Sequence, residues 1–164
     1  MGQFTNKILA EFQPPKKWKL GRDLVYTTSD LFANEIKSLQ DVGVEIKRDT
    51  DISPEAIITV PTGFITDLAS TPRLLWNVIA PFDVARAAIV HDLLYKTIRQ
   101  YRWNKGDIEE DKSLIKKAKV VADKVFLLAM KDAQPKVSGW KIYSAWKAVD
   151  LFGRWSIIPN EDNI

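Results

Sequence analysis

The stretch "DVARAAIVHDLLYKT", residues 83–97, places the only histidine of the 164-residue chain inside a largely apolar segment. The apolar spacing predicts a helix over residues 84–98. Because residues four apart lie on nearly the same face of a helix, His91 and Tyr95 share a face, with Asp92 at its edge. Two interpretations are open: the three side chains form a polar element of the core, or His91 is a general base.

The composition indicates a globular protein without thiol chemistry. Hydrophobic residues make up 46% of the chain and charged residues 27%, both ordinary values. A formal charge of +3 is too small to indicate a polyanionic partner, so nucleic acid is not expected. The absence of cysteine excludes disulfides, thiolate zinc sites and cysteine nucleophiles. With a single histidine, any metal would have to be held by oxygen ligands, which points to calcium or magnesium.

The first part of the chain, residues 1–69, is predicted to be rich in strands. β-Favouring runs indicate strands at residues 24–28, 43–49 and 55–64. Between the first two, the segment near residues 30–42 has helical spacing and predicts an inserted helix.

The second part, residues 70–156, has helical spacing throughout. The predicted helices cover residues 70–81, 84–98, 111–132 and 138–153, with a polar link between the second and the third. The expected fold class is therefore α+β, with a small N-terminal antiparallel sheet and a C-terminal bundle of about four helices. A chain of this length can build one core, so a single domain over residues 1–164 is expected.

Asp123 is an acid in an apolar stretch of the predicted helix 111–132. Because a buried carboxylate is costly without a partner, we expect a group to meet it. If the two helices pack antiparallel, His91 is a candidate, and the contact would orient the imidazole. The alternative is that Lys119, one turn earlier, pairs with Asp123 at the surface.

Two motifs support the first reading: "A-x-A-A-x-x-H-D-x-x-Y" at residues 85–95 and "A-D-x-x-F" at residues 122–126. They resemble the active-site helix pair of phospholipase A2, most closely its cysteine-free parvoviral form. The resemblance implies that His91 activates a water molecule and that Tyr95 and Asp123 hold the His91 side chain in place. It also implies that Asp92 binds calcium and that phospholipid or a host envelope is the partner. The sequence departs from that family in its calcium loop, because only Gly63 precedes the histidine helix where the family has a glycine-rich loop.

A longer resemblance connects three blocks, namely "V-P-x-G-F-x-T-D-L-A-S-x-P-R" at residues 60–73, "A-A-x-x-H-D-x-L-Y" at residues 87–95 and "A-D-x-x-F-x-x-A-M" at residues 122–130. This pattern is similar to an uncharacterised domain family common in bacteriophage and prophage genomes. It implies a phage origin and no established activity. The host cytoplasm or the virion is then the expected location, since the sequence shows no secretory signal and no apolar run of about 20 residues.

Three polar residues of the first block are candidate accessory residues: Asp67, Ser70 and Arg73. They could line a site beside His91. Alternatively, Asp67 and Ser70 are turn and cap residues, and capping is the favoured role for Ser70.

Two further sets of residues are expected to serve the fold. The lysines of the predicted helix 111–132 spread around its axis, which favours a solvated surface over phosphate binding. The aromatic residues of the last helix are expected in the core, with a membrane interface as the alternative. They are Trp140, Tyr143, Trp146 and Trp155.

The sequence therefore leaves two functions open. The first is a phage-encoded, phospholipase A2-like esterase in which the His91–Asp123 dyad activates water, with calcium as the expected cofactor. The second is a non-catalytic virion, tail or head–tail assembly component that contacts other virion proteins. In it, the histidine, aspartate and tyrosine side chains would form a buried network that fixes helix packing.

Overall fold

The computed structural model describes residues 2–48, 55–66, 84–106, 111–134 and 136–164. The predicted helix 70–81 lies outside these residues. The described part consists of two small antiparallel sheets and four helices, which confirms the α+β fold class.

The larger sheet has the strand order β1-β4-β6-β5, with every neighbouring pair antiparallel. Its strands are β1 (Gln3–Phe4), β4 (Leu24–Thr28), β6 (Ala56–Val60) and β5 (Ile46–Arg48). Side chains alternate between buried and half-buried along both β4 and β6. Because successive residues point to opposite faces of a strand, Tyr26 and Ile58, which are paired in register, bury the same face.

A smaller second sheet, in the order β2-β3-β7, was not expected from the sequence. Its strands are β2 (Ala10–Gln13), β3 (Lys17–Leu20) and β7 (Ile65–Thr66). Most of their residues are exposed or half-buried, so they lack the apolar alternation that reveals a strand. This sheet positions Thr66 beside the histidine helix.

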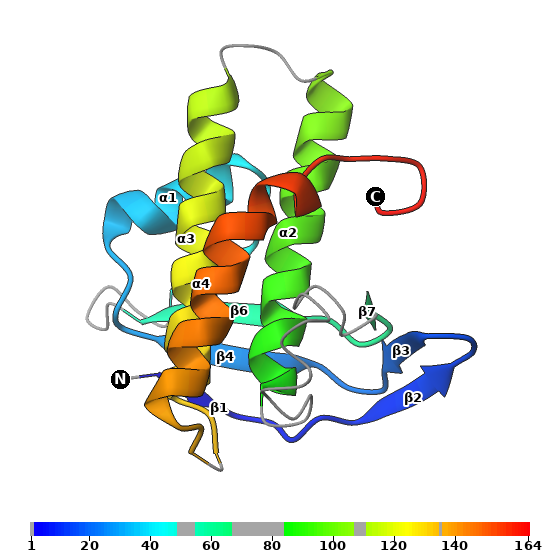
Figure 1. Cartoon of the computed structure of the whole chain (residues 1–164), viewed down its shortest axis with the longest axis vertical. Helices are drawn as coiled ribbons and strands as arrows, with labels where there is room; N and C mark the ends of the chain where they lie inside the picture. Colours follow the sequence, from blue (N-terminus) through cyan, green and yellow to red (C-terminus); the bar gives the residue numbers. More distant parts are fainter. Residues whose placement is uncertain (1, 49–54, 67–83, 107–110, 135) are drawn as a thin grey trace.

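The described residues form four helices (Figure 1): α1 (Ala33–Asp41), α2 (Ala85–Lys105), α3 (Lys112–Lys131) and α4 (Gly139–Ser156). Helix α1 is the predicted insertion. Helix α2 contacts β4 and β6, α3 packs between α1 and α2, and α4 packs on α3. None of the described helices is long and apolar enough to cross a membrane.

Helix α2 is longer than predicted, because it runs through the expected polar link to Lys105. Gly106 ends it in the left-handed conformation, with φ +67°. The polar residues of this extension have a structural role. The side chain of Arg99 donates to the carbonyl oxygens of Ser156 and Asn163, and that of Arg102 donates to the carbonyl oxygen of Ile157. The extension therefore ties the C-terminal segment to α2.

Helix α4 also continues past its predicted end, through Gly153 to Ser156. Gly153 is not a cap. It is buried, and a Cβ there would lie 2.1 Å from Tyr95 Oη and 3.1 Å from Lys119 Cε. The missing side chain lets α4 approach α2 and α3 closely.

The aromatic residues of α4 correct another expectation. Trp140, Tyr143 and Trp155 are 60%, 61% and 53% exposed, and only Trp146 is partly buried against the core. Helix α4 buries a narrow stripe of small and branched residues instead, such as Ala145 and Val149.

We predict that Gly153→Ala destabilises the protein by about 1–3 kcal/mol, because the added methyl group overpacks the contact with Tyr95. The matched control is Gly139→Ala in the same helix, where a Cβ would meet no atom within 4 Å. That change is expected to be neutral or to stabilise by up to about 1 kcal/mol. Chemical denaturation of both variants checks the difference, and equal stabilities would contradict the packing role of Gly153.

Candidate functional site

The contact predicted between α2 and α3 is present. His91 Nε2 lies 3.1 Å from Asp123 Oδ1, and both side chains are buried. The hydroxyl group of Tyr95 donates to the same oxygen at 2.7 Å. The helical spacing places the imidazole and the phenol ring 4.0 Å apart between centroids, and Phe126 closes the other side of the imidazole. The antiparallel helix pair thus joins the three predicted residues in one cluster.

Lys119 completes the cluster, and its role differs from the expected one. The sequence offered Lys119 as a surface partner of Asp123 in place of His91. The structure has both contacts, because Lys119 Nζ lies 2.7 Å from Asp123 Oδ2 while His91 and Tyr95 approach Oδ1. Lys119 is buried as well and also donates to the carbonyl oxygen of Asp150 in α4, at 2.9 Å.

The electrostatics of the cluster determine its protonation. Burial raises the pKa of Asp123, but the hydrogen bonds from His91, Lys119 and Tyr95 outweigh this effect and hold the pKa below its ordinary value of 3.8. Burial and the adjacent carboxylate raise the pKa of Tyr95, so its hydroxyl group remains a donor. Because ionised Asp123 only accepts hydrogen bonds, Nε2 of His91 must carry the proton that it shares with Oδ1.

The other ring nitrogen of His91, Nδ1, is therefore the acceptor of the neutral imidazole. It has no hydrogen-bond partner within the part of the chain that the structure describes. The ring as a whole is only 1% exposed. The arrangement can orient an imidazole and stabilise it when it gains a proton.

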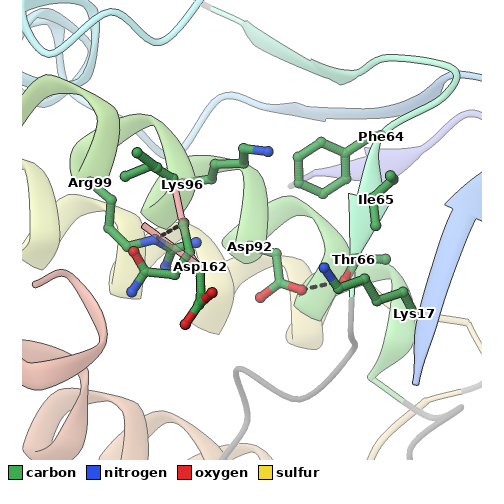
Figure 2. A pocket seen from close by; sticks show the side chains of 10 residues that line it. Lys17, Phe64, Ile65, Thr66, Asp92, Lys96, Arg99 and Asp162 are labelled. Atoms are coloured by element: carbon green, nitrogen blue, oxygen red, sulfur yellow. Dashed lines mark hydrogen bonds between the residues drawn. The ribbon is translucent and has the colours of Figure 1, made fainter. Parts of the chain in front are cut away.

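Asp92 points away from this cluster, toward a pocket of about 270 Å³ between α2 and the smaller sheet. Thr66 donates a hydrogen bond to Asp92 Oδ2 (Figure 2). The pocket also has an apolar wall of Phe64 and Ile65, and the C-terminal segment contributes Asp162. The histidine and the aspartate of the "HD" pair therefore face different surroundings.

The described surroundings of Asp92 do not fit a calcium site. Calcium takes about 6–8 oxygen ligands, whereas Lys17, Lys96 and Arg99 line the same pocket and would repel a divalent cation. No group of three or more acidic, histidine or cysteine residues able to hold a metal occurs in the described segments.

The structure adds residues that the sequence did not single out. Thr66 and Lys17 belong to short strands without a recognisable pattern, and Lys96 and Arg99 follow Asp92 by one and two helical turns. That last spacing is visible in the sequence and could have indicated a charged face. The three predicted accessory residues, Asp67, Ser70 and Arg73, lie outside the described residues.

Comparison with known proteins places this α+β chain in a family without an assigned activity. Residues 44–149, more than half of the chain, match the family described as "Protein of unknown function (DUF1353)". The chain belongs to this family. No curated protein and no solved structure matched it. The matched range includes the His91 helix, Lys119 and Asp123.

We predict that Asp123→Asn destabilises the protein by about 3–5 kcal/mol at neutral pH, because it leaves the buried Lys119 without its counter-charge. Since the folded-state pKa of Asp123 is lowered, the contribution of its carboxylate is complete above pH 3.8 and is lost as the pH falls through the folded-state value. The stability gap between the wild type and Asp123→Asn should therefore narrow below about pH 4.

Denaturation curves between pH 3 and pH 7 measure this gap. Asp41→Asn is the matched control, because Asp41 pairs with Lys37 on the surface and should change stability by less than about 1 kcal/mol. A gap for Asp123→Asn that is small, or that widens in acid, would contradict the buried ion pair.

Proposed function

We propose that this protein is a phage-encoded ester hydrolase of the phospholipase A2-like type, in which His91 activates a water molecule. The observation that carries the proposal is the division of roles between the two imidazole nitrogens. Asp123 holds Nε2, which leaves Nδ1 as the nitrogen that can take a proton.

In the proposed reaction, His91 Nδ1 removes a proton from water as the water oxygen attacks the ester carbonyl carbon. Asp123 stabilises the imidazolium that forms, and Tyr95 holds Asp123 in place. When the tetrahedral intermediate collapses, the C–O bond to the alcohol breaks and the imidazolium returns the proton to the departing alkoxide. The products are a carboxylic acid and an alcohol.

The Asp92 pocket, whose described lining does not include His91, would hold the negatively charged part of such an ester on the neighbouring face of α2. Lys17, Lys96 and Arg99 contribute cationic groups to the pocket, and Phe64 and Ile65 contribute an apolar wall. A phospholipid combines an anionic phosphate with apolar chains, so we propose phospholipid of a host envelope as the substrate class. The exposed aromatic residues of α4 would suit contact with a lipid–water interface.

A second candidate function is a virion or tail assembly component without catalysis, acting in the host cytoplasm or the particle together with other virion proteins. Two observations favour it. The ring of His91 is 1% exposed, and Lys119 already neutralises Asp123. Both are typical of a polar network that fixes the packing of two helices.

We predict that His91→Gln lowers ester hydrolysis by at least about 10²-fold, because the chain has no other histidine to take over the proton transfer. The assay uses a chromogenic short-chain ester and fluorogenic phospholipid vesicles. Turnover equal to that of the wild type would contradict the hydrolase.

Tyr95→Phe separates the two candidate functions, because it removes one hydroxyl group and keeps the ring packing. If the protein is a hydrolase, we expect this variant to lose about tenfold or more in activity, because Asp123 loses the hydrogen bond from Tyr95 that orients it. The matched control is Tyr143→Phe, at an exposed position of α4, which should leave hydrolysis of the soluble short-chain ester and thermal stability unchanged. The assembly component would be favoured by a different set of results. The wild type would have no esterase activity and would co-purify with particles, and Tyr95→Phe would lose thermal stability.

A further inference from the structure

A second pocket is lined by residues of α2, the first half of α3 and the C-terminal half of α4. Its volume is about 430 Å³, and it shares no described lining residue with the Asp92 pocket. Cationic side chains from all three helices line it, namely Arg102, Lys112, Lys116, Lys119 and Arg154. We propose that this basic pocket binds a phosphate group.

The lysines of α3 contribute to the pocket through their spacing. Lys112, Lys116 and Lys119 follow one another at intervals of four and three residues, so they lie on one face of the helix. The sequence favoured lysines spread around the helix on a solvated surface. That description holds for Lys117, which is exposed and is not part of the pocket.

Negative charge within the described lining is scarce, because Asp150 is its only carboxylate there. Asp150 already has two cationic neighbours: Lys147 Nζ at 3.3 Å and Lys119 Nζ at 3.9 Å. Among the described residues Lys116 has no ion-pair partner, and Arg154 stacks on the ring of Trp155 at 4.0 Å. Lys116 and Arg154 therefore share a pocket without a carboxylate partner among the described residues, and an anion between them would be attracted by both charges.

One cation of the lining, Lys119, is buried, which sets this cluster apart from a fully solvated lysine surface. Lys119 is only 7% exposed, and Asp123 and the carbonyl oxygen of Asp150 hold its ammonium group in place. Arginine and lysine together suit a phosphate, since the guanidinium group gives directed donors and the ammonium group a compact charge.

The remaining lining indicates what accompanies the phosphate. Ile115, Val120 and Ile157 form an apolar wall beside the cations. A ligand with a phosphate head and an apolar or neutral body would contact both parts. A small soluble phosphomonoester and the headgroup of an anionic lipid share this chemistry.

The proposal does not depend on hydrolysis by His91, although Lys119 links the two sites. Lys119 lines the basic pocket and forms the ion pair with Asp123 that belongs to the dyad. The experiment therefore leaves Lys119 intact and measures binding rather than turnover.

The test is calorimetric titration of the full chain at low ionic strength with inorganic phosphate and glycerol 3-phosphate, together with sedimentation with vesicles of phosphatidylcholine, with and without phosphatidic acid. The variants are Lys116→Gln and Arg154→Gln, both at exposed positions. We expect saturable binding that each variant weakens about tenfold, the effect of one charge-assisted contact of about 1.4 kcal/mol. The matched control, Lys117→Gln, removes the same charge from the same helix outside the pocket and should bind like the wild type.

The two arms identify the source of the phosphate. Binding of glycerol 3-phosphate without vesicles indicates a soluble ligand, and binding only to vesicles with phosphatidic acid indicates a lipid headgroup. The proposal is overturned if neither arm shows saturable binding, or if Lys117→Gln weakens binding as much as Lys116→Gln does. The latter result would mean that net charge alone attracts the anion.

Discussion

The packing of the helices depends on one buried carboxylate, that of Asp123, which requires hydrogen-bond donors around it. A carboxylate in an apolar interior is stable as an anion only when donors surround it. Helix α2 supplies His91 and Tyr95, and α3 itself supplies Lys119. These contacts fix how far α2 and α3 are shifted along each other. The same requirement extends to α4, where Gly153 makes room for the Tyr95 hydroxyl group and the carbonyl oxygen of Asp150 accepts from Lys119.

Much of this arrangement could be predicted from the sequence, because it follows from local periodicity. The helical spacing of His91 and Tyr95 and the cost of burying Asp123 predicted the two helices and made His91 one of two candidate partners of Asp123, with Lys119 the other. The β-favouring residues of β4 and β6 predicted these two strands in the same way. Such patterns show which side of a helix or strand is buried, because they depend only on residues that are close in the sequence.

The sequence could not reveal features that depend on distant partners. The polar end of α2 is stable as a helix because the C-terminal segment supplies carbonyl oxygens to Arg99 and Arg102. Gly153 was predicted to end the last helix, because glycine often follows a helix. In the structure it lies within α4, where its missing side chain allows close contact with Tyr95 of α2. The aromatic residues of α4 are exposed because α4 packs through small residues, and an apolar residue does not by itself reveal which face is covered. Lys117 and Lys119 are the same residue type in the same helix, and only the packing of α3 makes Lys119 buried and Lys117 exposed.

The same helix packing creates two pockets of different chemistry around one polar core. The Asp92 pocket lies between α2 and the smaller sheet and combines cations with carboxylates. The basic pocket lies between α2, α3 and α4, and cations outnumber the single carboxylate in its described lining. Lys119 connects the core to the basic pocket. The oriented imidazole is the basis of the proposed hydrolysis, and the cations that line the two pockets are the basis of the proposed anionic ligands.

The central claim, that ionised Asp123 holds Nε2 of His91 and leaves Nδ1 as the acceptor, can be measured directly by ¹⁵N nuclear magnetic resonance of the imidazole. The chain has a single histidine, so the ring signals need no assignment by mutation. The account predicts that the neutral ring carries its proton on Nε2, protected from exchange with solvent, and that Nδ1 is unprotonated. A ring that carries its proton on Nδ1, or that exchanges both forms rapidly as a free histidine does, would contradict it.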